Sequence, residues 1–240
     1  MALLEARRLG LRLAGRPVLR DVGLRLEAGE LALLRGPNGA GKTSLLRLLA
    51  GLERPTEGLI LWRGRRLEEL GPRYRGVLAW VGHRVALYPR LSGRESLLLH
   101  AAGYPWLDRQ EALRRAQLWL ERAGLERWAD RPVVHYSRGM QQRLAIARSF
   151  LADPELVLLD EAAGGLDEAG RDFLARALEE ARGRGAAAVL VSHEADPGLG
   201  EVDRCWRLEA GRLREEERER PRGGWQEATA ARSSPSSARS

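Results

Sequence analysis

The sequence predicts an α/β fold with a mainly parallel central sheet, and two patterns carry this prediction. First, short apolar runs bounded by turn residues alternate along the chain with longer helical patterns. The runs at 31–34, 156–159 and 187–192 are almost continuously apolar, which is typical of strands buried on both faces. Second, the run at 31–34 leads directly into a glycine-rich segment and then a helical pattern. Strand, glycine loop and helix in this order indicate a phosphate-binding site.

The glycine-rich segment at 36–43 matches the pattern G-x-x-x-x-G-K-[ST] without a gap. Its glycines let successive backbone N–H groups curl around an anion, and the start of the following helix adds its positive end. We expect Lys42 to reach the β- and γ-phosphates of a nucleotide and the Thr43 hydroxyl to bind Mg²⁺. Lys42 is the only lysine among 40 lysine and arginine residues, so a compact ammonium is kept where a planar guanidinium would not fit. The predicted phosphate-binding residues are Gly36, Pro37, Asn38, Gly39, Ala40, Gly41, Lys42, Thr43 and Ser44.

Length and composition bound the kind of protein. The 240 residues, of which 44% are hydrophobic, suit one α/β domain or two small subdomains that share a core. No stretch approaches the roughly 18 apolar residues that cross a bilayer, and the N-terminus has no basic leader. We therefore expect a cytoplasmic protein. Cys205 is the only cysteine, which excludes an internal disulfide and a cysteine metal cluster, and we expect it to be a buried structural thiol.

The chain is basic, with a formal net charge of +7. Such a charge raises nucleic acid or an anionic membrane surface as partners. Arginines and glutamates are interspersed, however, without a long block of like charge. The seven tryptophans lie mostly on apolar faces and do not form a stacking platform for bases. We expect a solvated surface of mixed charge and no specific nucleic acid partner.

The N-terminal part of the chain reads as short strands broken by turns. Leucines alternate with other residues at 9–13 and again at 24–26, and a turn is predicted at 15–17. The helix after the glycine loop is predicted to end at Gly51. Further strands are predicted at 59–62 and 77–81.

The hydrophobic pattern of the sequence changes at two points after these strands. From about 84 to 151 the pattern is helical, with apolar stripes among arginine and glutamate. A further helix is predicted at about 168–184. After Leu213 the apolar pattern stops, and the remaining residues are charged and then rich in serine, alanine and arginine. We predict a folded region at 1–213 and a disordered tail at 214–240.

Three predicted strands end next to polar residues that suit phosphate chemistry. Because open parallel sheets bind ligands at the carboxyl ends of their strands, we expect the glycine loop, the pair Asp160-Glu161 and His193 to converge. Asp160 is predicted to hold Mg²⁺, and Glu161 to accept a proton from the attacking water or to orient it. An acidic pair after a strand can also begin a helix, but a metal-binding carboxylate is what the glycine loop still lacks.

Three segments resemble motifs of the ATP-binding cassette (ABC) ATPases. Residues 137–143 (Ser-Arg-Gly-Met-Gln-Gln-Arg) resemble their signature motif, 160–167 their Walker B motif and D-loop, and 191–193 their switch histidine. Order and spacing agree over about 1–213. The resemblance implies a P-loop NTPase fold, with a RecA-like core built on a mainly parallel sheet, an N-terminal antiparallel β subdomain and an α-helical subdomain inserted at about 84–151.

The resemblance also implies how the residues act. Two chains would sandwich two ATP molecules with Mg²⁺, because the signature helix of one chain faces the γ-phosphate held by the other. Ser137 is a good N-cap for that helix, which is predicted to run to about Leu151, and Gly139 leaves room for a phosphate. ATP would also contact Gln141 and Asp167. Catalytic roles are implied for Lys42, Glu161, His193 and His83.

Four positions depart from the family pattern. His83 stands where a glutamine usually contacts Mg²⁺ and the attacking water, and a neutral imidazole offers one acceptor nitrogen for the same role. His83 therefore counts as a metal-binding as well as a catalytic residue. Leu13 occupies the position of the aromatic residue that stacks on adenine. Arg138 replaces a signature glycine and Ala162 replaces a proline, and neither change removes a catalytic group.

Gly82-His83, taken with the signature segment, resembles the ATPase subunit of the haem exporter of cytochrome c maturation. This resemblance implies a second ATPase subunit, integral membrane partners and a place on the cytoplasmic face of the inner membrane. Residues 84–91 would couple to the membrane partner, where Arg84, Tyr88 and Arg90 are either contacts or a solvated loop. Another ABC exporter is an alternative. A soluble ABC ATPase acting on nucleic acid or ribosomes is disfavoured, because the chain has neither coiled-coil arms nor a second cassette.

Overall fold

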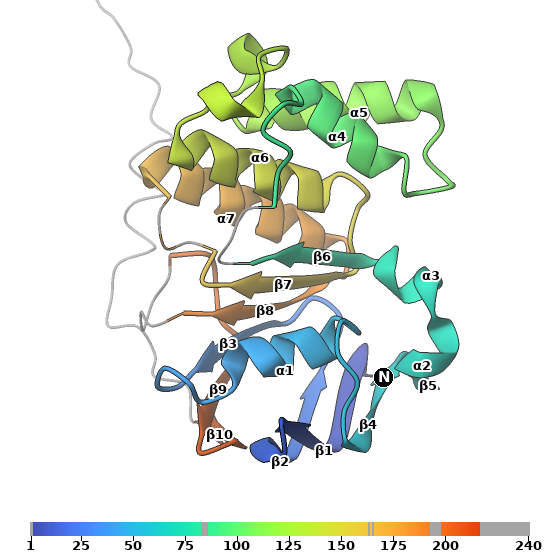
Figure 1. The fold of residues 1–240 in the computed structure, drawn as a ribbon, viewed down its shortest axis with the longest axis vertical. Helices are drawn as coiled ribbons and strands as arrows, with labels where there is room; N and C mark the ends of the chain where they lie inside the picture. The colour runs from blue at the N-terminus through green and yellow to red at the C-terminus, as the bar shows by residue number, and fades with distance from the viewer. Residues whose placement is uncertain (1, 83–85, 163, 165, 193–197, 217–240) are drawn as a thin grey trace, which may run out of the picture.

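Two sheets and a set of helices form the fold in the computed structural model, which describes residues 2–82, 86–162, 164, 166–192 and 198–216. Figure 1 shows a four-stranded sheet at one end of the molecule, a six-stranded sheet in the middle and helices beyond it. The expected α/β architecture is confirmed, because five strands of the six-stranded sheet run parallel to one another.

The four-stranded sheet is antiparallel and has the order β2-β1-β4-β5. Its strands are β1 (Leu4–Leu13), β2 (Arg16–Leu26), β4 (Glu57–Trp62) and β5 (Arg65–Arg66). The turn between β1 and β2 contains Gly15, whose φ of +78° lies in the left-handed region that glycine enters without strain. The predicted turn and the N-terminal antiparallel subdomain are thus confirmed.

The six-stranded sheet has the order β10-β9-β3-β8-β7-β6. Its strands are β3 (Leu31–Arg35), β6 (Leu78–Val81), β7 (Leu156–Asp160), β8 (Ala187–Val191), β9 (Arg204–Glu209) and β10 (Arg212–Glu216). The folded region continues past the predicted boundary at Leu213, because β10 pairs with β9 through Glu216. Arg207 forms an ion pair with Glu216 across these strands, and charged pairs of this kind leave no apolar pattern in the sequence.

Helices occupy the segments where the sequence predicts them, and two short helices at 67–75 were not predicted. The helices are α1 (Lys42–Leu49), α2 (Leu67–Leu70), α3 (Pro72–Arg75), α4 (Gly93–Ala101), α5 (Arg109–Arg122), α6 (Arg138–Phe150) and α7 (Glu168–Gly183), with 3₁₀ turns η1 (Glu126–Trp128) and η2 (Val133–His135). Ser92 begins α4 in a capping box with Glu95, and Asp108 caps α5 through the backbone N–H of Glu111. Among the described helices, none combines the length and the apolar character needed to cross a membrane.

Side chains of the six-stranded sheet alternate between two separate hydrophobic cores. Leu31 and Leu33 of β3 pack with α5, α6 and α7 on one face, whereas Ala32 and Leu34 pack with α1 and the four-stranded sheet on the other. Figure 1 shows α1 between the two sheets and α6 and α7 on the far side of the six-stranded sheet. Burial on both faces explains why this strand is continuously apolar.

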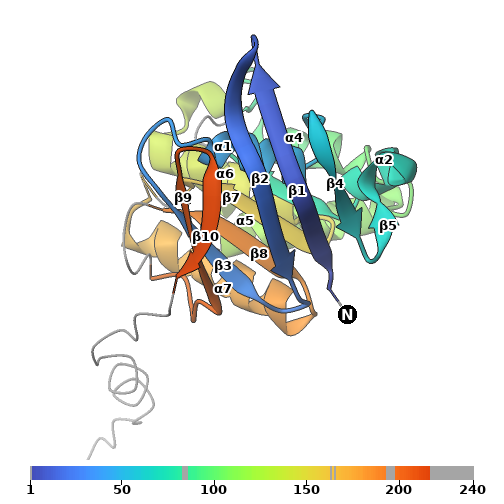
Figure 2. The same cartoon turned by 90° about the horizontal axis from the view of Figure 1, so that it is seen from below.

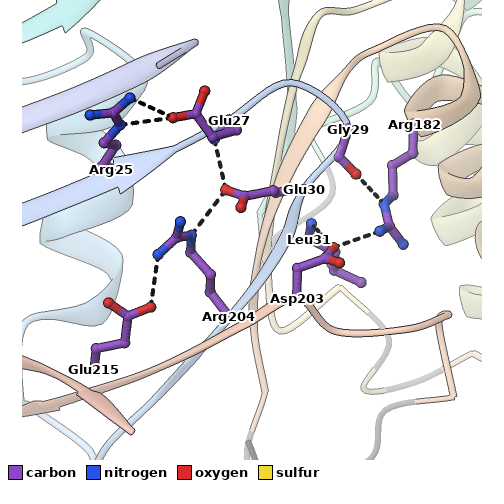
Figure 3. Close-up of polar contacts among 9 residues, drawn as sticks. All are labelled: Arg25, Glu27, Gly29, Glu30, Leu31, Arg182, Asp203, Arg204 and Glu215. Carbon is purple, nitrogen blue, oxygen red and sulfur yellow. Dashed lines mark hydrogen bonds and ion pairs between the residues drawn. The ribbon is translucent and has the colours of Figure 1, made fainter. Parts of the chain in front are cut away.

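Polar contacts fix the start of β3 (Figure 3). The carboxylate oxygen Oδ2 of Asp203 accepts hydrogen bonds from the backbone N–H of Leu31 at 2.8 Å and from the guanidinium of Arg182 at 2.6 Å. Arg204, the first residue of β9, donates a hydrogen bond of 3.0 Å to the carboxylate of Glu30. These contacts hold β3 against its neighbour, and β3 is the strand that leads into the glycine loop.

The β9–β10 hairpin lies beside β2 of the other sheet, as Figure 2 shows. The backbone N–H of Arg20 in β2 donates to the carbonyl of Gly211 in the hairpin turn at 2.8 Å. Cys205 in β9 is only partly buried, so the expectation of a buried structural thiol is wrong. It packs at the margin of the core that contains α5, α6 and α7, because β9 lies near the edge of the sheet.

Candidate functional site

The strand ends that the sequence predicts to meet are neighbours in the sheet. β3, β8 and β7 run parallel and adjacent, with Leu34 opposite Val191 and Asp160 opposite Val191 as well. The glycine loop after β3 and the acidic pair at the end of β7 therefore lie at the same edge of the sheet. This convergence is confirmed for the described residues, whereas His193 lies outside them.

Backbone geometry explains the glycines of the loop. Gly36 has a φ of +150°, and a Cβ at this position would lie 2.1 Å from the carbonyl oxygen of Leu208 in β9. Gly41 has a φ of +101° and is the N-cap of α1, packed against β2 close to Leu19. Gly39, with a φ of +79°, has open space around it. The loop is thus wedged between β9 and β2, while Pro37 to Gly39 are exposed.

Lys42 bends back over the loop that precedes it. Its side chain is 6% exposed, and Nζ donates to the carbonyl oxygens of Gly36 at 2.8 Å and Pro37 at 3.1 Å. The first turn of α1 contains no acidic residue, so nothing there opposes the positive end of the helix. Thr43 is exposed and Ser44 partly buried beside it. An ammonium, a helix N-terminus and an exposed loop surface are together chemically suited to hold an anion.

Asp160 and Glu161 differ in environment although they are adjacent. Asp160 ends β7 and is 6% exposed. Glu161 is partly buried and has a φ of +55°, an uncommon conformation for a residue other than glycine. Its backbone N–H donates to the carbonyl of Val191 at 3.2 Å, which holds it at the end of β8. The acidic pair does not begin a helix, because α7 starts later, at Glu168.

The signature segment begins helix α6 as predicted. Ser137 is the N-cap, and its hydroxyl accepts a hydrogen bond from the backbone N–H of Met140 at 3.2 Å. A Cβ on Gly139 would meet nothing within 4 Å, so the backbone there is open to a ligand. Gln141 instead turns toward its own chain, with Nε2 donating to the carbonyl of Tyr136 at 3.2 Å. Figure 1 shows α6 and α1 on opposite faces of the six-stranded sheet.

Three further predicted residues lie on separate elements. Asp167 caps α7, its Oδ1 accepting from the backbone N–H of Gly170 at 2.8 Å, and its side chain is exposed. Leu13 is 42% exposed at the end of β1. It belongs to the β1–β2 hairpin, whose Val18 lies close to Gly41 of the loop. His83 lies outside the described residues.

Sequence patterns missed one contact that joins two parts of the site. Nε2 of Gln142 in α6 donates to the carbonyl oxygen of Ala162, directly after Glu161, at 3.1 Å. Gln142 belongs to the signature segment, but no spacing rule connects it to a loop that follows another strand. The close approach of β9 to Gly36 was missed for the same reason.

Comparison with known proteins places this chain in a family. The model of the ABC transporter family matches residues 19–164. The cytochrome c biogenesis ATP-binding export protein CcmA 2 of Cupriavidus metallidurans is 40% identical over 201 residues, which cover 84% of this chain and 94% of that protein. The protein CcmA of the same description from Escherichia coli K12 is 36% identical over 195 residues, covering 81% of this chain and 90% of its own length.

Solved structures agree with these relatives. An ATP-binding subunit of an ABC transporter superposes with a TM-score of 0.82 at 32% identity, covering 89% of both chains. An ATP-binding cassette solved as a dimer in a post-hydrolysis state with ADP and Pi has a TM-score of 0.76 at 28% identity, covering 89% of this chain and 97% of its own. The chain therefore belongs to the ABC transporter family, as one of its ATP-hydrolysing subunits.

Proposed function

We propose that this chain is the ATP-hydrolysing subunit of a haem exporter that serves cytochrome c biogenesis. The observation that carries the proposal is the 40% identity to a cytochrome c biogenesis ATP-binding export protein over 94% of that protein's length. Likeness over nearly the whole relative includes the helical segment as well as the nucleotide site. It therefore extends beyond the motifs that all ATPases of the family share.

The glycine loop would hold the phosphates of ATP. In the protein alone, Lys42 donates to two neutral carbonyls, and a phosphate oxygen is a stronger acceptor for its ammonium. The N-terminus of α1 would add its backbone N–H groups from Thr43 and Ser44. Leu13, on the hairpin beside the loop, would lie along the base without the π-face that an aromatic residue offers.

The donor set at the end of β7 fits Mg²⁺. Mg²⁺ takes oxygen ligands and is usually held by one or two carboxylates together with substrate phosphates. Asp160 and the Thr43 hydroxyl supply such oxygens, and within the described residues no group of three His, Cys, Asp or Glu forms a metal cage by itself. Bound there, Mg²⁺ would neutralise charge on the phosphates. The metal role of His83 stays a prediction from the sequence.

Glu161 would act as the base in hydrolysis. The oxygen of a water molecule attacks the γ-phosphorus, the bond from that phosphorus to the ADP oxygen breaks, and the water's proton passes to the Glu161 carboxylate. The position of Glu161 supports this role, because it directly follows the buried Asp160 and is fixed by its backbone bond to Val191. His193, expected to contact the γ-phosphate, would complete the site.

The active form would be a dimer of this chain. Because α6 and α1 cover opposite faces of the six-stranded sheet, the open backbone at Gly139 is free to face the nucleotide of a second copy. Ser137, Gln141 and Asp167 would join the same interface. The dimeric, ADP- and Pi-bound relative supports this arrangement.

Integral membrane subunits would receive the motion of this dimer at the cytoplasmic face of the inner membrane. Closure on ATP and opening after hydrolysis would be transmitted through the helical segment at 84–151. Tyr88 and Trp106 of that segment are 62% and 57% exposed, so both side chains are accessible to such a partner.

The test uses the chain in its own host. With Lys42→Ala in place of the natural chain, ATP binding is expected to be lost and mature c-type cytochromes, detected by covalent haem staining, to disappear while b-type cytochromes remain. Co-purification with membrane proteins is expected, without salt-sensitive binding to nucleic acid. Unchanged c-type cytochromes in the Lys42→Ala strain would overturn the proposed export role.

A further inference from the structure

Gln142 contacts the loop that carries the proposed base. Its amide nitrogen Nε2 donates to the carbonyl oxygen of Ala162 at 3.1 Å, so this bond links helix α6 to the loop that follows β7. Only the nitrogen end of the amide can donate to a carbonyl, so the contact fixes which way the side chain faces. Ala162 is 1% exposed, and a buried carbonyl needs a donor.

The loop needs restraint because Glu161 is held in an unfavourable conformation. A φ of +55° is disfavoured for a residue with a Cβ and persists only where the surroundings determine it. Two backbone bonds contribute: Glu161 N–H donates to Val191 at 3.2 Å, and Gly164 N–H donates to the Glu161 carbonyl at 3.1 Å. The amide of Gln142 adds a side-chain restraint from a helix.

We infer that Gln142 is a positioning residue, which holds the Glu161 loop in its strained conformation and ties that loop to α6. The inference rests on the proposed role of Glu161 as the base. In the proposed dimer, the start of α6 faces the nucleotide of the second copy. A shift of α6 on closure therefore reaches the Glu161 of the same chain through Gln142. Binding of α6 to the nucleotide of the second copy thereby positions the Glu161 base at the chain's own nucleotide site.

The experiment replaces the donor and compares rate with affinity. Gln142→Glu keeps the shape of the side chain but cannot donate when ionised, and Gln142→Ala removes it. Each variant is expected to lower the single-turnover rate of ATP hydrolysis by about tenfold, the effect of one lost hydrogen bond, and to leave the ATP Kd unchanged. Gln142→Arg supplies a new donor and is expected to recover most of the rate.

A second readout does not depend on turnover. In the nucleotide-free protein, the amide protons of Glu161 and Gly164 are expected to exchange with solvent faster in Gln142→Glu than in the parent. The matched control is Gln110→Glu, the same change at an exposed position of α5, which is expected to alter neither exchange nor rate.

Combination with Glu161→Gln separates the possible failures. If Gln142 acts through Glu161, Gln142→Glu lowers the residual rate of Glu161→Gln no further. A parent-like rate in Gln142→Glu, or an equal fold-loss in both backgrounds, would overturn the positioning role while leaving Glu161 as the base. A parent-like rate in Glu161→Gln itself would instead overturn the role of Glu161 as the base within the proposed function, and the role of Gln142 with it.

Discussion

Acidification should destabilise the protein through His100, a side chain of α4. Burial, together with the positive charge of Arg148, lowers the pKa of His100 from 6.5 to about 4. Tyr104 packs against the imidazole edge to face, with ring centroids 5.2 Å apart, and its hydroxyl lies 3.1 Å from Nε2. The folded protein therefore accommodates the neutral ring and resists its protonation.

The direction and size of the effect follow from proton binding in the two states. Between pH 6.5 and about 4 the unfolded chain carries the His100 proton and the folded chain does not, so protons favour unfolding in this window. The stabilising contribution is fully present above pH 6.5 and is lost as the pH falls toward 4. The loss amounts to about 2 kcal/mol at pH 5 and about 3 kcal/mol at pH 4.

Urea denaturation at pH 7 and pH 5 measures this loss. The parent is expected to lose about 2 kcal/mol more unfolding free energy than His100→Gln over this interval, because glutamine can accept from Tyr104 but does not titrate. The other three histidines are common to both proteins, so any contribution they make cancels in the comparison. Equal losses in the two proteins would refute the assignment of the effect to His100.

Three further predictions concern the loop, the start of β3 and the catalytic pH profile. Gly36→Ala should lower the unfolding free energy by about 2 kcal/mol or more, because the added Cβ would lie 2.1 Å from a carbonyl oxygen of β9. The control is Gly183→Ala, where a Cβ meets no atom within 4 Å, and it should be neutral or stabilising in the same denaturation assay. Asp203→Ala leaves the buried N–H of Leu31 without this acceptor and should lower the unfolding free energy by about 1–3 kcal/mol. A change within the error of the denaturation assay would show that this contact does not stabilise the start of β3. ATPase activity should fall as the pH drops through about 6.5, and His83→Gln should flatten this limb; identical profiles would exclude a catalytic role for His83.

The glycine loop and the sheet could be predicted because their signals are local. The pattern at 36–43 specifies strand, loop and helix together, and the continuous apolar run of β3 follows from burial on both faces. The meeting of Asp160 with the loop was predictable as well, because parallel strands end at one edge. In each case, nearby residues carry the information.

Other features depend on contacts between distant segments and leave no pattern of their own. In the sequence, Gln142 is an ordinary polar residue of an amphipathic helix, and its role depends on a contact with the loop after β7, which only the folded structure shows. The sequence did not predict strand β10, because β10 has no apolar face that would show in the pattern. It is held by pairing with β9 and by ion pairs such as that between Arg204 and Glu215, at 2.9 Å. The lowered pKa of His100 likewise depends on burial of its imidazole in the folded chain and, to a smaller extent, on the charge of Arg148 in α6.

Single-turnover hydrolysis by Glu161→Gln tests most directly whether this residue takes the proton of the attacking water. The variant is expected to bind ATP as tightly as the parent, to hydrolyse it at least about a hundredfold more slowly, and to accumulate as an ATP-bound dimer in size-exclusion chromatography. The substitution keeps the size of the side chain and removes only its basicity. Hydrolysis at the parent rate, with no accumulation of the dimer, would contradict the assignment of Glu161 as the base.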